Sequence, residues 1–192
     1  MSLPPETDEA RREARERARK AATAGDWLTL ALDHHLEIED AFAAIREAQD
    51  EDERREELKE LALVLTGHSN AEESVLYPAL FAAGENDHAM EAYAEQATAK
   101  VQMAMLEALP LMSRDFLDKL EHIRGAVAHH MYEEEGTWFL ELKSKGANQS
   151  RLTTRYIEEF ERYVGTIDPL DDEDGETPLK SFGVLPRHDV RS

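Results

Sequence analysis

The chain has 192 residues, with 42 acidic against 22 basic side chains and a formal net charge of −20. This acidity excludes the phosphate backbone of nucleic acids and anionic membranes as default partners. The absence of cysteine excludes disulfides, zinc fingers, iron–sulfur clusters and a thiol nucleophile. The sequence opens without the apolar stretch of a signal peptide and has no apolar run of membrane-spanning length, so we expect a cytoplasmic protein.

The two ends of the sequence differ from its middle. Residues 6–24 place Arg and Glu at helical i,i+3 and i,i+4 spacings, which predicts that residues 1–25 form a charged, solvated helical arm. Residues 165–192 combine an acidic run with Pro and Gly, which predicts an acidic, flexible tail. The domain itself is then expected over residues 26–164.

Apolar residues in the middle of the chain recur at steps of three and four, which predicts an all-α fold. Helices are expected near residues 26–49, 52–83, 86–109 and 114–145, with a shorter helix at 149–164 packing across one end of the bundle. Pro110 ends the third helix, and Ser113 is the expected N-cap of the fourth. The third helix has the weakest pattern, and its expected inward residues are Met90, Tyr93, Ala97, Val101 and Met105.

One local pattern occurs twice, as HSNAEESVLYP from His68 and as HMYEEEGTWFL from His130. Because four residues slightly exceed one helical turn, His68 and Glu72 project from one face, and His130 and Glu134 do the same on another helix. Each pair interrupts an apolar seam, where an uncompensated carboxylate would cost several kcal/mol.

A cation held between the helices would compensate this charge, and a third imidazole is available on the first helix at His35. A single pair at such a spacing is more often a hydrogen-bonded pair at a loose seam, but two pairs in register favour a metal site. Imidazole and carboxylate donors without sulfur suit iron, manganese or zinc. Two facing carboxylates can bridge two metals, which favours binding of dioxygen or a related small ligand.

These segments, together with DHHLEIEDAF at residues 33–42, resemble the hemerythrin-like HHE cation-binding domain over roughly residues 26–145. The resemblance implies an up-and-down four-helix bundle with a non-haem di-iron centre and a role in oxygen, redox or iron sensing or handling, or in peroxide chemistry. It also implies that the imidazoles are terminal ligands and the carboxylates are bridges. The implied metal ligands are His35, His68, Glu72, His130 and Glu134, with His34 and His129 as the neighbouring alternatives.

The sequence departs from the family pattern on the third helix. Gln96 follows Glu95 where the family carries an imidazole ligand, and Lys100 stands one turn later. The family leads us to expect two iron ions, and the missing histidine leaves one ion as the alternative. The candidate substitutes for the missing ligand are Glu95, Tyr93, Glu73 and His88, whereas Tyr77 is expected to close the core or its rim.

Two other readings stay open. A ferritin-like carboxylate site would need two Glu-x-x-His motifs, and the sequence offers one, from Glu85 to His88. A metal-depleted bundle could instead act as a protein-interaction module, with no partner that the sequence identifies. No nucleophile, phosphate-binding loop or dinucleotide motif appears, so any enzyme activity would be metal-based oxygen or peroxide chemistry.

Overall fold

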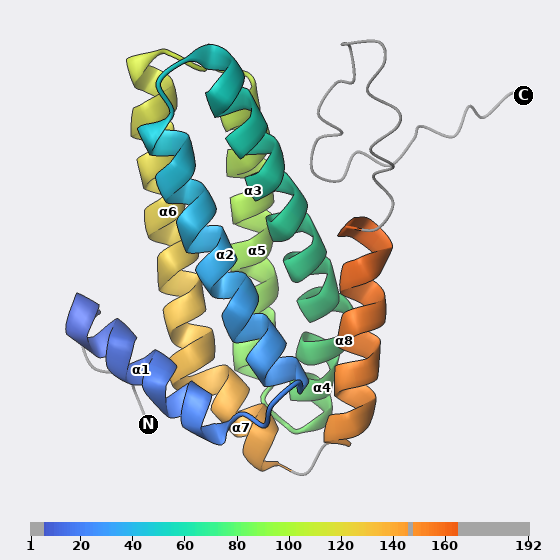
Figure 1. Ribbon diagram of the computed structural model, residues 1–192. Coiled ribbons are helices and arrows are strands. Elements are labelled where there is room, and N and C mark those ends of the chain that lie inside the picture. The colour runs from blue at the N-terminus through green and yellow to red at the C-terminus, as the bar shows by residue number, and fades with distance from the viewer. Residues whose placement is uncertain (1–5, 146–147, 165–192) are drawn as a thin grey trace, which may run out of the picture.

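The computed structural model describes residues 6–145 and 148–164, and within them the regular structure is entirely helical. Four long helices form the up-and-down bundle that the sequence predicts (Figure 1). They are α2 (Trp27–Glu47), α3 (Glu51–Ala71), α5 (Asn86–Glu107) and α6 (Arg114–Glu133). None of the described helices is long and apolar enough to cross a membrane.

Two of the bundle helices continue beyond a one-turn π-helix. After α3, the π-turn η1 (Glu72–Leu76) leads into α4 (Tyr77–Ala82). After α6, the π-turn η2 (Glu134–Trp138) leads into α7 (Phe139–Ser144). Each π-turn begins at one of the two predicted bridging glutamates, and such turns inside helices occur often at functional sites.

Side-chain caps fix the helix starts. Asp26, Asp50 and Ser113 each accept a hydrogen bond from the backbone N–H three residues ahead. The Ser113 cap confirms the predicted start of α6. Gly25 precedes the first of these caps with a positive φ of 76°, a conformation that glycine adopts without strain.

Most of the core of the described residues lies in two large apolar clusters, with a small third cluster of Ala10, Ala14 and Tyr132. One contains Trp27, Tyr77, Trp138 and Phe139 and lies at the end of the bundle where α4 and α7 are found. The other runs from Ile38 along the remainder of the bundle. The interrupted seams that the sequence predicts therefore lie between two apolar layers.

The helix α1 (Asp8–Ala21) differs from the predicted solvated arm. Its alanines Ala14 and Ala18 are fully buried, and the helix lies against the lower ends of α2 and α6 in Figure 1. The prediction of a solvated arm was wrong on this face. The alanines between the charged residues form a narrow apolar strip that packs on the bundle, and the many charged residues of the sequence hide this strip. The acidic tail predicted over residues 165–192 lies outside the described residues.

The last helix, α8 (Gln149–Val164), also differs from its expected placement. It runs along α3 rather than across one end of the bundle (Figure 1). Gly67 on α3 permits this approach, since a Cβ atom there would lie 2.8 Å from a methyl carbon of Val164. The fully buried Tyr156 brings a hydroxyl group from α8 to the bundle interior.

The expected inward face of α5 was wrong in its helical phase. Met90, Val101 and Met105 are 63%, 59% and 52% exposed, whereas Gln96 and Met103 are buried. Alanines lie on every side of this helix, so apolar residues alone do not select the inward face. The rotation matters for function because it directs Gln96 into the bundle centre.

Candidate metal centre

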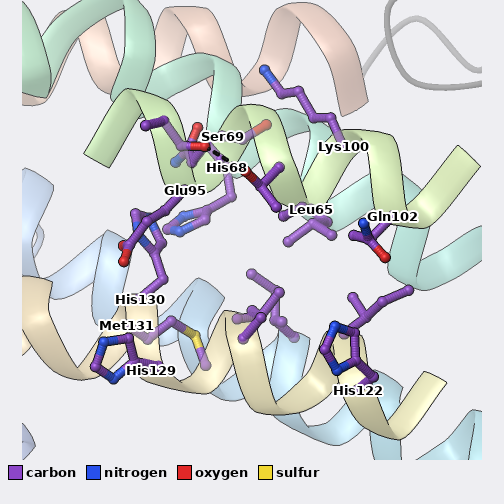
Figure 2. Close-up of a pocket in the computed structure, with 18 of the residues that line it drawn as sticks. Leu65, His68, Ser69, Glu95, Lys100, Gln102, His122, His129, His130 and Met131 are labelled. Carbon is purple, nitrogen blue, oxygen red and sulfur yellow. Dashed lines mark hydrogen bonds and ion pairs between the residues drawn. The ribbon is translucent and has the colours of Figure 1, made fainter. Parts of the chain in front are cut away.

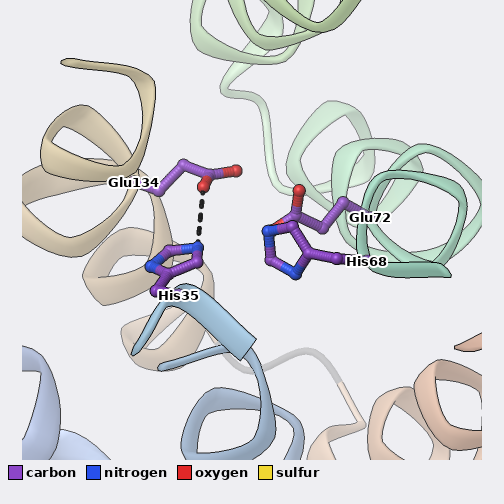
Figure 3. A group of neighbouring side chains, drawn as sticks. All are labelled: His35, His68, Glu72 and Glu134. Carbon is purple, nitrogen blue, oxygen red and sulfur yellow. Dashed lines mark ion pairs between the residues drawn. The ribbon is translucent and has the colours of Figure 1, made fainter. Parts of the chain in front are cut away.

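Three helices bring four of the predicted ligands together. His35 comes from the middle of α2, while His68 and Glu72 come from the junction of α3 and η1. Glu134 begins η2 on the opposite side (Figure 3). One donor atom from each of these four buried residues lies within 4.8 Å of the others, a spacing at which they could hold a metal ion.

The inner atoms of this group have no hydrogen-bond partners. His35 Nε2 lies 3.3 Å from Glu134 Oε2, and His68 Nε2 lies 3.2 Å from Glu72 Oε1, yet none of these four buried atoms makes a hydrogen bond. Buried polar atoms are almost always paired in folded proteins. Four buried donor and acceptor atoms that converge without hydrogen bonds therefore fit a cation between them.

The outer nitrogens of the two imidazoles are hydrogen-bonded, which orients the rings. His35 Nδ1 lies 2.8 Å from Glu135 Oε1, and the Arg15 guanidinium of α1 binds the same carboxylate. His68 Nδ1 lies 3.0 Å from the Tyr156 hydroxyl of α8. An imidazole held at Nδ1 by an acceptor presents its Nε2 lone pair to a metal.

His130, the fifth predicted ligand, lies on the other side of the two carboxylates. Its Nδ1 lies 2.8 Å from Glu95 Oε2, and its Nε2 lies 3.1 Å from the Tyr77 hydroxyl and 3.4 Å from Glu134 Oε1. The Tyr77 side chain is fully buried, so of the two places expected for it, the core and its rim, it lies in the core. The Tyr77 hydroxyl therefore lies between His130 and Glu72, while His130 keeps a direct contact with Glu134.

The electrostatics of the centre follow from burial and mutual charge. Burial lowers the pKa of His35, but the carboxylates of Glu134 and Glu135 outweigh it and raise that pKa to about 9. Burial lowers the pKa of His68 well below its usual range. Burial and the neighbouring Glu134 raise the pKa of Glu72, whereas the imidazoles of His130 and His35 overcome burial and keep the pKa of Glu134 low. Without a metal, the His35 imidazole and the Glu134 carboxylate thus each favour the charged form of the other.

The neighbouring histidines have other contacts. His34 is buried against α8, with Nδ1 3.0 Å from the Tyr156 hydroxyl and its ring stacked on Phe160. His129 is about half exposed and pairs with Glu6. The helical periodicity predicts that His35 and His130, rather than His34 and His129, face the bundle interior, and the structure places His35 and His130 there.

None of the candidate substitutes for the missing third-helix ligand reaches the centre. Tyr93 donates a hydrogen bond to the Glu73 backbone carbonyl, and Lys100 pairs with the Glu73 side chain. Glu95 bonds to the outer nitrogen of His130. His88 belongs to a second, half-buried group with Glu85 and Glu141 that could also hold a cation.

A cavity of about 370 Å³ reaches this centre from between α5 and α6 (Figure 2). Apolar side chains such as Leu65 and Val127 form much of its wall, and His68, Gln96 and His130 lie along its lining. In Figure 2, Glu95 and His130 lie at one end of the cavity, and Gln102 and His122 at the other. A small molecule in this cavity would therefore lie beside the imidazoles of His68 and His130.

The model of the Hemerythrin HHE cation binding domain matches residues 7–142. The chain belongs to this family. A hemerythrin HHE cation-binding domain-containing protein from Mycobacterium kansasii has a similar crystal structure, with 25% sequence identity and a TM-score of 0.65. That similarity covers 73% of this chain and 88% of the other. The match begins at residue 7, so it includes α1 and confirms the hemerythrin-like architecture.

A curated relative from Nostoc sp. (strain PCC 7120 / SAG 25.82 / UTEX 2576) is described as a DNA nickase. It is 26% identical over 132 residues, which make up 68% of this chain. The match spans 36% of the length of that relative, about a third. The similarity is therefore to one portion of a longer protein.

Proposed function

We propose that this hemerythrin HHE protein binds iron through His35, His68, Glu72 and Glu134 and uses it to sense or handle oxygen, peroxide or iron itself. The observation that carries this proposal is the convergence of four buried, unpaired donor and acceptor atoms. Two imidazoles and two carboxylates without sulfur form a donor set that suits iron and also accepts manganese or zinc. Bound iron would supply redox chemistry and open coordination positions for small ligands.

The residues around the donors prepare the centre for such an ion. Glu135 and the Tyr156 hydroxyl hold the two imidazoles by their outer nitrogens, so that little reorientation is needed when a metal binds. Arg15 balances the charge of Glu135, which is itself buried. The cavity between α5 and α6 supplies a path for a small ligand, and its largely apolar wall suits dioxygen or a peroxide better than a large charged substrate.

The test is anaerobic loading with ferrous iron, followed by a metal count per chain and an optical spectrum before and after oxygen is admitted. We expect bound iron, and a charge-transfer absorption that changes with oxygen. His35→Ala should abolish binding. His129→Ala is the matched control, because His129 is half exposed and should leave binding intact. A protein that binds no iron would favour the metal-free interaction module. Equal binding by both variants would contradict the assignment of His35 as a ligand and place the iron elsewhere, such as at the second group of His88, Glu85 and Glu141.

DNA nicking is not proposed for this chain. Its formal charge of −20 repels a phosphate backbone, and the Nostoc relative is matched over a third of its length.

A further inference from the structure

Helix α5 has a second apolar face on the outside of the bundle. The described residues include seven exposed large apolar side chains, and three of them, Met90, Val101 and Met105, lie on this one helix. Four exposed alanines continue the face, and they are Ala94, Ala97, Ala104 and Ala108. A helix that packed only on the bundle core would present polar side chains here. We propose that a second copy of this chain binds this face through its own α5, antiparallel to the first, in a two-fold symmetric dimer.

The spacing of the exposed apolar residues is that of a helix paired with another helix. Their positions are separated alternately by four and three residues, which keeps one stripe facing a partner over the whole length of α5. The stripe consists of Met90, Ala94, Ala97, Val101, Ala104 and Ala108, and Met105 lies on its edge. Because most of these side chains are small, two helix axes can approach to about 8 Å.

An antiparallel arrangement pairs each large side chain of the stripe with a small one. When the two-fold axis passes between Ala97 and Val101, Met90 faces Ala108 of the second copy, and Val101 faces Ala97. A shift by one heptad in one direction would instead bring Met90 against Val101 and overpack that layer. A shift in the other direction would carry Met90 past the end of the second helix. The face is therefore complementary to itself in one register, as a two-fold interface requires.

The distribution of charge favours the same arrangement. The chain has a formal charge of −20, so two copies repel each other over most of their surfaces. None of the exposed residues of α5 from Ala94 onward is charged, and its two exposed acids, Asp87 and Glu91, lie in its first two turns. In antiparallel helices the two Glu91 positions would be about 21 Å apart along the axis, well beyond the Debye length of about 8 Å. Parallel helices would place them side by side.

The proposed interface borders the cavity that leads to the candidate metal centre. Glu91, Ala94 and Thr98 are exposed on α5 and also line that cavity, so they lie at its opening. A second copy on this face would therefore cover one edge of the opening between α5 and α6. Dimerisation would thus restrict the size of the molecules that enter, and it requires no bound metal.

Sedimentation equilibrium of the full chain, without metal, measures the dimer. The interface is one helix face about 33 Å long, at the small end of the range for specific complexes, so we expect a micromolar dissociation constant. Higher salt should strengthen the dimer, because it screens the repulsion between two acidic copies. Val101→Glu should raise the dissociation constant by about a hundredfold or more, since each copy would bury an unpaired carboxylate. Leu36→Glu is the matched control, because Leu36 is 40% exposed on α2 and lies outside the interface.

Cysteine cross-linking tests the orientation, because the chain has no cysteine of its own. Thr98 lies beside the proposed two-fold axis, so a short bis-maleimide should link Thr98→Cys to its own copy. Glu91→Cys, seven residues earlier on the same edge of α5, should not link to itself across about 21 Å. A mixture of Glu91→Cys and Met105→Cys should link, since these two positions face each other in the antiparallel register.

The outcomes separate the interface from its orientation. A parent protein that stays monomeric throughout the micromolar range would overturn the proposed dimer and assign this face to a different partner or to another segment of the chain. Equal dissociation constants for Val101→Glu and Leu36→Glu would overturn α5 as the interface. Self-linking of Glu91→Cys would overturn the antiparallel orientation. None of these measurements uses iron, so their failure would leave the proposed metal-binding function standing.

Discussion

Glu135 positions a ligand without facing the proposed metal. It accepts at 2.8 Å from His35 Nδ1, which directs the lone pair of Nε2 toward the other donors. We predict that Glu135→Gln weakens metal affinity by about tenfold to hundredfold, as expected for loss of an outer carboxylate partner. A competition titration against a chelator measures the change. Glu39→Gln is the control, because Glu39 binds the same Arg15 but is not bonded to His35. Equal losses in both variants would assign the effect to Arg15 instead.

The sequence predicts the histidines and carboxylates of the centre better than it predicts their neighbours. His68 with Glu72 and His130 with Glu134 follow from the i,i+4 spacing alone, which a helix converts into a shared face. The position of Tyr77 depends on a π-turn, in which the backbone hydrogen bond spans five residues instead of four, and regular α-helical periodicity does not reveal it. Tyr156 comes from a separate helix, and no local pattern links it to His68.

At the scale of elements, Arg15 links α1 to the metal centre by binding Glu135, which in turn contacts His35. Ala14 is fully buried where α1 meets the bundle. We predict that Ala14→Leu lowers the free energy of unfolding by about 1–3 kcal/mol, because added methyl groups overpack a closed contact. Urea unfolding measures the loss. Glu13→Leu places the same side chain at an exposed neighbouring position and should leave stability nearly unchanged. A similar loss in both would indicate an effect of helix propensity or solubility instead.

Asp26 joins α2 to α7 and to the segment that precedes α2. Its carboxylate accepts from the Thr29 and Thr23 N–H groups and pairs with Lys143 of α7. Burial raises the pKa of Asp26, but Lys143 and these backbone donors lower it more, so the folded pKa lies below the ordinary value. A lowered folded pKa gives stability that is present above about pH 4 and is lost as the pH falls through the folded value.

We therefore predict that Asp26→Asn, which retains a capping oxygen, costs about 1–2 kcal/mol at neutral pH. The difference in unfolding free energy from the parent protein should shrink below about pH 4. Urea unfolding at several pH values measures it. A difference that stayed constant down to acidic pH would contradict the role assigned to the charge.

The phases of the helices show where prediction from sequence stops. The bundle helices α2, α3 and α6 have stripes of large apolar residues, and their predicted inward faces contain buried residues such as Phe42, Leu61 and Phe116. Helix α5 has alanines on all sides, so its orientation about its own axis depends on neighbouring residues, including the Glu72 carboxylate that accepts a hydrogen bond from Gln96. The same limit applies to α8, whose placement depends on the small Gly67 of α3.

At the scale of the whole molecule, the polar centre lies between the two large apolar clusters of the core. Unpaired buried polar atoms destabilise the metal-free protein, and a ligand that binds the folded state alone stabilises it. At a free metal concentration of one hundred times Kd, the gain should be about 2.7 kcal/mol. Thermal unfolding with and without ferrous iron, under anaerobic conditions, should show this increase.

Replacing the polar pair by apolar residues separates metal-dependent stability from packing. The double variant His68→Leu, Glu72→Leu removes two unpaired atoms that face each other at 3.2 Å. Since apolar side chains of similar volume are often as stable as buried ion pairs, or more stable by about 1–4 kcal/mol, the metal-free variant should match or exceed the metal-free parent. Iron should then add nothing to the variant but stabilise the parent. A metal-free variant that loses several kcal/mol would contradict this expectation, and it would show that the pair stabilises the fold without a metal.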